Sequence, residues 1–151
     1  MSYHRSIMSK LKVKKLVPSA HLPEKARAGD LGYDLFAADH VLIHPGEMRT
    51  VGTGIAVEFP PGWGGVIKDR SSMAMKRLTV SAGVIDSGYR GEIKVLISNH
   101  STASQTIEQN QKIAQLIPSP VTDWKIEETH ELSDTHRGEG GFGSTGLFKA
   151  T

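Results

Sequence analysis

Short runs of apolar residues, several of them alternating with polar residues, dominate most of the chain. Each run has about 4 to 10 residues and is bounded by Gly, Pro, Asp, Asn or Ser. Alternation with period two is typical of a strand with one buried face, and many such strands predict an all-β sandwich, barrel or jelly roll. The predicted strands cover residues 11–17, 33–37, 40–45, 50–59, 65–69, 93–99, 105–109 and 112–118.

Three other stretches complete this prediction. Residues 71–77, SSMAMKR, predict the only helix, a short one with Ser71 or Ser72 as its N-cap. Residues 59–65, FPPGWGG, predict a turn at a strand end because proline removes the donors that a central strand needs. Residues 123–129, DWKIEET, form the last predicted strand.

Composition and charge narrow the class of protein. With 151 residues, 38% of them hydrophobic and 6% aromatic, the chain predicts one domain whose core is built from small aliphatic residues. The lack of cysteine excludes disulfides and thiolate metal sites. A net charge of +2 and the absence of a long apolar run predict neither a nucleic-acid partner nor a membrane partner. We expect a cytoplasmic protein with no export signal, and a nuclear or organellar pool is compatible with this.

The segment RGEGGFGSTG, Arg137–Gly146, contains five glycines in ten residues. Glycine is costly to order, and a terminal segment of this kind is normally frayed. Its GxGxxG string is not a dinucleotide fingerprint, because too few residues follow it to form a helix. Glycine N–H groups can nevertheless surround an anion, and one aromatic side chain can cover a flat ring. Two interpretations therefore stand, a disordered tail and a mobile arm that closes over a nucleotide.

Four further stretches carry candidate chemistry, each with a structural alternative. AGVIDSGYRGEIKV, residues 82–95, predicts a hairpin with Gly88 in its turn, in which Asp86 is either a turn residue or a base. KDRSSMA, residues 68–74, is either a helix cap or an anion site. AGDLGYDLFA, residues 28–37, offers turn residues or acids near a cation, and NQKIAQLI, residues 110–117, is a core strand with one outward glutamine.

Together, these five stretches resemble the five ordered motifs of the trimeric deoxyuridine triphosphate nucleotidohydrolases, the dUTPases, from about Lys12 to Gly146. The resemblance implies a jelly-roll-like fold and a homotrimer whose three active sites are shared among subunits. It implies a β domain over residues 1–136 and a C-terminal arm over 137–151 that closes over the site. The implied reaction is attack of water on the α-phosphorus of dUTP, giving dUMP and pyrophosphate. This reaction keeps uracil out of DNA and supplies dUMP for thymidylate synthesis.

The resemblance also assigns roles to residues by position. Asp86 is similar to the catalytic base, and Tyr89 to the ring that packs under deoxyribose and leaves no space for a 2′-hydroxyl. Asp34 resembles the acid that holds waters on a Mg²⁺ ion. The resemblance also implies three groups of substrate-binding residues. The edge of uracil is contacted by Ala82, Gly83 and Val84, and the phosphates are contacted by Arg70, Ser71, Ser72 and Gln115. The third group lies in the arm and consists of Arg137, Phe142, Gly143, Ser144 and Thr145. In the arm, Phe142 is implied to stack on uracil and the other residues to bind the γ-phosphate.

Three positions depart from the family pattern. Lys112 stands where arginine is usual, which keeps a charge and loses a fork of donors. Asp69 stands where proline or a small residue is common, and an acid beside a phosphate site is unfavourable unless it points away. Val80 replaces an asparagine found in many bacterial members, which puts in doubt a contact that orders the catalytic water.

Other functions remain open at this point. A dCTP deaminase of the same fold, either monofunctional or bifunctional, is the alternative enzyme. A non-catalytic nucleotide sensor and a capsid-like jelly roll are the alternatives from other classes. His40 and His44 would share one face of a strand, but no third zinc ligand is spaced with them.

Overall fold

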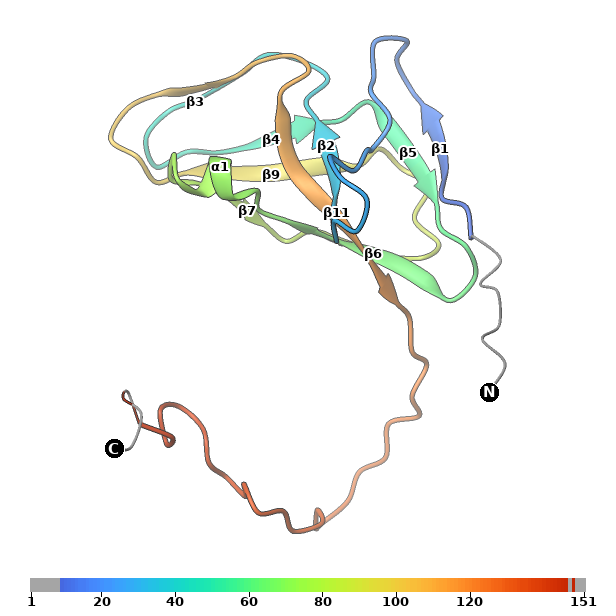
Figure 1. Cartoon of the computed structure of the whole chain (residues 1–151), viewed down its shortest axis with the longest axis vertical. Helices are drawn as coiled ribbons and strands as arrows, with labels where there is room; N and C mark the ends of the chain where they lie inside the picture. The colour runs from blue at the N-terminus through green and yellow to red at the C-terminus, as the bar shows by residue number, and fades with distance from the viewer. Residues whose placement is uncertain (1–8, 147, 149–151) are drawn as a thin grey trace.

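The computed structural model of the chain describes residues 9–146 and residue 148. Within these residues the chain forms eleven β-strands and one helix of a single turn (Figure 1). The strands are β1 (Lys12–Lys15), β2 (Tyr33–Phe36), β3 (Val41–Ile43), β4 (Met48–Gly52), β5 (Ile55–Glu58), β6 (Trp63–Lys68), β7 (Leu78–Ser81), β8 (Val84–Ile85), β9 (Lys94–Asn99), β10 (Gln105–Ile107) and β11 (Lys112–Pro120). The helix α1 (Ser71–Ala74) lies between β6 and β7.

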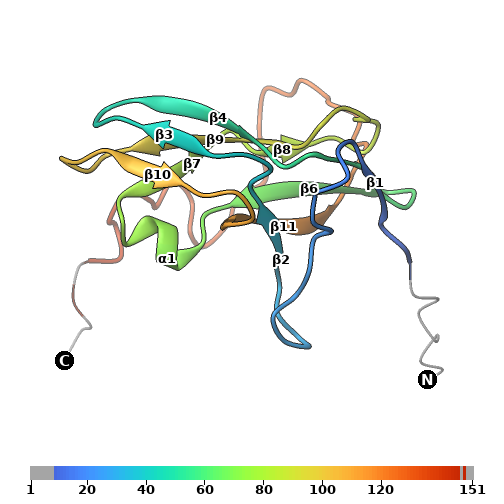
Figure 2. The ribbon, with the colours of Figure 1, turned by 90° about the horizontal axis from the view of Figure 1, so that it is seen from above.

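The strands pair in four antiparallel sheets. The largest has the order β2-β11-β6-β8, the second is β4-β9-β7, and β1-β5 and β10-β3 form two-stranded sheets. Seen from above, β4 and β9 lie in one layer and β6 and β11 in another (Figure 2). This arrangement confirms the all-β, jelly-roll-like prediction, although the sheets of the described chain do not close into a barrel.

The core between the sheets is built from aliphatic side chains, as the composition predicts. Val95 and Ile97 of β9, Ile67 of β6 and Leu116 of β11 are each at most 2% exposed and belong to one buried cluster. Burial of a side chain of this size contributes about 1.5–3 kcal/mol. The strand β1 confirms the predicted wet face, because Lys12, Lys14 and Lys15 are exposed while Val13 packs against the core.

The predicted single strand over residues 50–59 is wrong, because the chain changes sheet within it. Gly54 has φ +68, a left-handed conformation that favours glycine, and it separates β4 from β5. A Cβ atom at Gly54 would also lie 2.7 Å from Cγ2 of Val17. The strand β4 therefore pairs with β9, while β5 pairs with β1.

Two local predictions around β6 also need correction. The turn predicted over residues 59–65 ends at Gly62, and the last three of these residues begin β6, which pairs with both β11 and β8. The prolines precede this strand, so they remove none of its donors. The helix α1 has Arg70 as its N-cap, with no side-chain cap, whereas Ser71 and Ser72 lie inside the helix. The hydroxyls of both serines are therefore not used for capping.

The predicted hairpin over residues 82–95 is wrong. A turn does form after Asp86, whose carbonyl accepts a hydrogen bond of 3.0 Å from the N–H of Tyr89. The flanking strands belong to different sheets, however, because β8 pairs with β6 and β9 pairs with β4 and β7. The connection between them is thus a loop that crosses from one sheet to the other.

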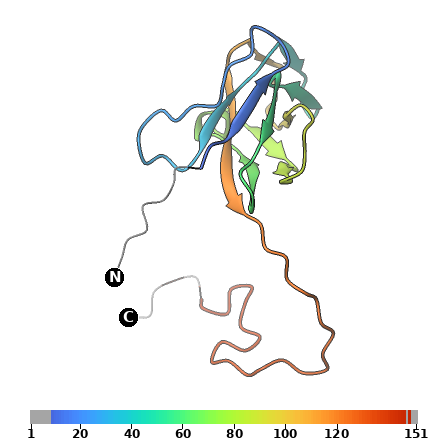
Figure 3. The ribbon, with the colours of Figure 1, turned by 90° about the vertical axis from the view of Figure 1, so that its right-hand side faces the viewer.

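Residues 121–146, here called the tail, extend away from the sheets (Figures 1 and 3). The strand predicted over 123–129 is absent, because no neighbouring strand of the described chain pairs with it, and Trp124 and Ile126 are 80% and 88% exposed. The last strand ends at Pro120, so residues 121–136 are not part of the sheets. Residues 1–8 of the predicted β domain, and 147 and 149–151 of the predicted arm, lie outside the described residues. No described helix has the length and apolar character to cross a membrane.

Candidate functional site

Three neighbouring strands place the first group of predicted site residues. In the register of the largest sheet, Gln115 of β11 lies opposite Asp34 of β2 on one side and Lys68 of β6 on the other. The chain then continues from β6 through Arg70 into α1. These elements surround a cavity of about 290 Å³, here called the arginine pocket, lined by Ala26, Asp30, Leu31, Gly32, Asp34, Arg70, Ser71 and Gln115.

Ion pairs fix the charged groups of the arginine pocket. Asp34 is 12% exposed at its side chain, and its two carboxylate oxygens lie 2.9 Å from Nε of Arg70 and 2.9 Å from Nζ of Lys112. The hydrogen bond to Asp34 raises the pKa of Lys112, against the opposing effect of desolvation. Nη1 of Arg70 donates to Oγ of Ser72 at 3.2 Å. The guanidinium is thus oriented before any ligand binds.

Asp69 points away from the arginine pocket. Its carboxylate accepts a hydrogen bond from the backbone N–H of Val80, and its carbonyl accepts one of 2.7 Å from Nε2 of Gln115. The acid therefore joins the end of β6 to β7 and to β11, and it does not oppose an anion beside Arg70. From the sequence, an acid at position 69 is expected to be unfavourable beside a phosphate site unless it points away, and Asp69 does point away.

A second cavity, of about 210 Å³, lies beside β8 and the loops that join it to β7 and β9. This loop pocket is lined by Ser81, Ala82, Gly83, Val84, Ile85, Asp86, Tyr89, Glu92, Lys94 and Leu96. Ala82 and Gly83 have φ values of +57° and +97°, and a Cβ at Gly83 would lie 2.8 Å from the carbonyl oxygen of Ile67. Left-handed backbone at a residue other than glycine is strained and gathers at functional sites. The carboxylate of Asp86 is exposed at this pocket, where water can reach it.

The glycine segment, Arg137–Gly146, lies outside both cavities. Nε of Arg137 donates to the carbonyl of Gly140 at 2.8 Å, and Phe142 is fully exposed with φ +49. Every hydrogen bond recorded for residues 122–146 stays within that stretch. The structure therefore brings Asp34, Arg70, Ser71 and Gln115 together, and Ala82–Val84 together with Asp86 and Tyr89, but it does not bring Arg137, Phe142, Gly143, Ser144 and Thr145 to either group.

The histidine pair does not form a metal site in the structure. Nδ1 of His40 lies 2.7 Å from Oε2 of Glu108, whereas Nδ1 of His44 lies 3.0 Å from Oγ of Ser104. Among residues 9–146 and 148, no group of three or more His, Cys, Asp or Glu side chains is arranged to hold a metal ion.

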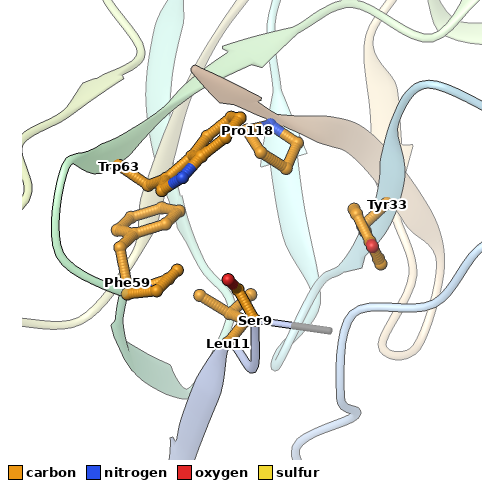
Figure 4. Close-up of a pocket in the computed structure, with 7 residues that line it drawn as sticks. Ser9, Leu11, Tyr33, Phe59, Trp63 and Pro118 are labelled. Atoms are coloured by element: carbon orange, nitrogen blue, oxygen red, sulfur yellow. The ribbon is translucent and has the colours of Figure 1, made fainter. Parts of the chain in front are cut away.

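A third cavity, of about 250 Å³, is mainly apolar and contains none of the predicted site residues. Its walls are Ser9, Leu11, Tyr33, Phe59, Pro60, Trp63 and Pro118 (Figure 4). It has aromatic surface but no cationic lining residue for a phosphate.

Sequence reasoning missed two contributors to the site. Lys112 entered only as a departure from a family pattern, yet its ammonium neutralises Asp34. Glu92 was not singled out, yet it lines the loop pocket and accepts the hydroxyl of Tyr89 at its carbonyl. A residue that acts through its backbone carbonyl leaves no signal in its side-chain type.

Comparisons with known proteins point to one family. The sequence model of the dUTPase family matches residues 18–146. The chain is 47% identical over 145 residues to the deoxyuridine 5′-triphosphate nucleotidohydrolase of Clostridium acetobutylicum, covering 94% of this chain and 100% of that protein. It is 48% identical over 141 residues to the protein of the same name from Gloeothece citriformis, covering 91% and 97%.

Solved structures also point to the dUTPase family. A mutant dUTPase of Staphylococcus bacteriophage 80alpha, solved with dUpNHpp, superposes with a TM-score of 0.86 at 30% identity and covers 91% of this chain and 99% of that chain. A mutant dUTPase of phage phi11 of S. aureus, solved to describe the coordination of a structural Mg(II) ion, gives a TM-score of 0.77 at 27% identity and covers 83% and 99%.

Proposed function

Because the chain belongs to the dUTPase family and is an enzyme that hydrolyses dUTP to dUMP, we propose that it acts by attack of water on the α-phosphorus, with pyrophosphate as the second product. The observation that carries this mechanism is the loop pocket. It places the exposed carboxylate of Asp86, the ring of Tyr89 and the backbone edge of Ala82–Val84 around one cavity.

Asp86 is the general base of the proposed reaction. Its carboxylate is open to solvent beside the cavity, so it can accept a proton from the attacking water. The left-handed backbone at Ala82 and Gly83 presents main-chain polar groups that read uracil, and Tyr89 packs under the deoxyribose. In this proposal the loop pocket selects the uracil and the deoxyribose of the substrate, and it also holds Asp86, the general base.

The arginine pocket and the glycine segment hold the triphosphate. Arg70 is oriented by Asp34, while Ser71 and Ser72 keep exposed hydroxyls, and Gln115 completes the wall of the cavity. Arg137, Ser144 and Thr145, with the N–H group of Gly143, bind the γ-phosphate, and Phe142 stacks on uracil. Charge neutralisation of this kind supplies most of the catalysis in phosphoryl transfer.

Mg²⁺ is the proposed cofactor, and the residues of the arginine pocket fit an indirect role. Both oxygens of Asp34 already accept from cationic side chains, so this carboxylate suits waters around the ion and not the ion itself. The remaining oxygen ligands would come from the triphosphate. When bound, the ion neutralises charge on the phosphate oxygens.

A homotrimer with shared sites is the proposed assembly. The arginine pocket and the loop pocket have no lining residue in common, and the glycine segment contacts neither. In the tail, Trp124 and Ile126 alternate with Lys125 and are almost fully exposed, which suits a strand that pairs with another copy. The three parts of one active site would then come from different subunits.

The test of the proposed function is pyrophosphate release from dUTP, compared with dTTP, dCTP and UTP. We expect rapid, Mg²⁺-dependent release from dUTP alone, and a mass shift from ¹⁸O-water in dUMP, which reports attack at the α-phosphorus. Label found in pyrophosphate would overturn the proposed position of attack, and ammonia released from dCTP would indicate a deaminase. The supply of dUMP for thymidylate synthesis follows from the same reaction.

A further inference from the structure

Tyr89 is a surface residue whose ring nevertheless has a defined position. The residue is 43% exposed, and its hydroxyl donates a hydrogen bond of 2.9 Å to the carbonyl of Glu92. The same end of the ring lies against the bare α-carbon of Gly91. A Cβ atom at Gly91 would lie 2.5 Å from Oη, 2.6 Å from Cζ and 3.0 Å from Cε2 of Tyr89. The ring therefore occupies the space that a side chain at position 91 would need.

The acceptor of this hydrogen bond is itself rigid. Oε1 of Glu92 accepts the backbone N–H of Gly54 at 3.0 Å. The next residue, Ile93, is completely buried, and its N–H donates to the carbonyl of Ile55 at 2.8 Å. Its carbonyl accepts the hydroxyl of Thr53 at 2.6 Å. The backbone that holds the hydroxyl of Tyr89 is thus tied to the chain around β5.

Backbone conformation does not explain a glycine at position 91. Its φ lies outside the left-handed region, in contrast to that of Gly83 in the same pocket. The residue is also exposed, so an added methyl group would meet no core side chain. All three nearest atoms belong to the far end of one side chain that is open to solvent on its other face. The ring of Tyr89, and not the fold, must move if a side chain is added.

We infer that Gly91 is a positioning residue for sugar selection: its missing side chain, together with the carbonyl of Glu92, holds the ring of Tyr89 where a 2′-hydroxyl would otherwise fit. The inference rests on the proposed role of Tyr89 in excluding that hydroxyl. Gly91 touches no substrate and acts only through the ring. A methyl group at position 91 displaces the ring, breaks its hydrogen bond and opens space beside the sugar.

Gly88 offers a matched control in the same loop. It is exposed, its φ also lies outside the left-handed region, and a Cβ atom there would meet nothing within 4 Å. Gly88→Ala and Gly91→Ala therefore impose the same loss of backbone freedom on the unfolded chain, while only Gly91→Ala meets the ring.

The experiment measures kcat/KM for UTP and for dUTP, with melting temperatures, in Gly91→Ala, Gly88→Ala, Tyr89→Ala and the double variant at positions 89 and 91. Hydrophobic contacts reject an added hydroxyl by at most about a hundredfold, so we expect Tyr89→Ala to raise the UTP/dUTP ratio by about ten- to a hundredfold. Gly91→Ala should raise it about tenfold with little change in melting temperature, and Gly88→Ala should leave it unchanged. In the double variant Gly91→Ala should add nothing, because the ring through which it acts is gone.

The outcomes separate this inference from the proposed function. If Tyr89→Ala raises the ratio and Gly91→Ala does not, the inference fails while the proposed role of Tyr89 stands. If neither changes the ratio, the role of Tyr89 fails and the inference falls with it. An effect of Gly91→Ala that persists without the ring also overturns the inference. Should Gly91→Ala not fold, Tyr89→Phe removes only the hydrogen bond to Glu92, and an unchanged ratio in that variant would contradict a ring held by its hydroxyl.

Discussion

The arginine pocket and the glycine segment are both proposed to hold phosphate groups, yet they are built in opposite ways. In the pocket, Arg70 is oriented by a carboxylate that is 12% exposed, and that carboxylate is also paired with Lys112. In the segment, Arg137 makes a local hydrogen bond to Gly140, and Phe142 beside it is fully exposed. One region is organised by the fold, and the other has only its own turns.

The difference in preorganisation decides what each region contributes to stability, to binding and to catalysis. A preorganised cation loses little freedom when the ligand binds, so it contributes both to binding and to the stability of the folded protein. A glycine-rich segment must be ordered at the moment of binding, which offsets part of the energy of its contacts. A segment that orders late can, however, admit substrate and release product, and it can close on the transition state.

The largest expected effect is on the chemical step, which belongs to neither phosphate region. Asp86→Asn should keep the fold and nucleotide binding but lower kcat by about 10²- to 10⁴-fold, the usual contribution of a general base. Asp39→Asn is the matched control, since it removes the charge of another exposed acid outside both pockets. Single-turnover kinetics and a binding isotherm for a non-hydrolysable dUTP analogue check this. A kcat within about twofold of the wild type would remove Asp86 from its role.

Deletion of residues 137–151, which removes the glycine segment and the residues after it, tests the proposal that this segment becomes ordered only when substrate binds. An arginine–phosphate contact contributes about 1.5–3 kcal/mol, stacking on a base about 1–3 kcal/mol, and ordering of the glycines offsets part of this sum. We expect kcat/KM for dUTP to fall at least about a hundredfold, much of it in kcat, while the melting temperature without ligand stays nearly unchanged. Hydrogen exchange in the intact protein should show the segment protected only with the analogue bound. Full activity after truncation would make the segment a disordered tail.

The same contrast explains what could be predicted from sequence. Alternation in residues such as Leu11 to Lys14 indicates a strand with one buried face, because period two is a local property, and β1 confirms it. Pairing is not local. The turn after Asp86 was predicted, but β8 joins β6 while β9 joins β4, because a sheet partner depends on the whole topology. Trp124 and Ile126 have the alternation of a strand and no partner within the described chain.

The candidate site also contains features that can be predicted from the sequence and features that depend on the fold. The residue types of Arg70 and Asp86 indicate charge and proton transfer, so both could be proposed as site residues before the fold was known. The partner of Arg70 was not, because Asp34 reaches it only through the register of β2 with β11. Ser71 or Ser72 was predicted to cap the helix, but Arg70 takes the cap position with extended backbone.

Paired substitutions of the two arginines compare the regions directly. Arg70→Ala removes one of the two cations beside the largely buried Asp34, so we expect a loss of about 1–2 kcal/mol in the free energy of unfolding. Arg137→Ala should leave the stability unchanged, because its contacts are local and exposed. Both should lower kcat/KM for dUTP by about ten- to a hundredfold. Chemical denaturation and steady-state kinetics measure these quantities. Equal stability of the two variants would show that the arginine pocket is not organised by its ion pairs.

The smallest expected effect concerns the proton of Lys112. Its hydrogen bond to Asp34 raises its pKa above the ordinary value of 10.5, so the folded protein holds this proton more tightly than the unfolded chain does. The resulting stabilisation is complete below about pH 10.5 and is lost as the pH rises through the folded pKa. Lys112→Arg keeps its charge at higher pH, so its melting temperature should fall less than that of the wild type between about pH 9 and pH 11.5. Lys125→Arg in the tail should follow the wild-type curve, because Lys125 is exposed and no ion pair is recorded for it among the described residues. Parallel curves for Lys112→Arg and the wild type would show that this charge pair does not stabilise the arginine pocket.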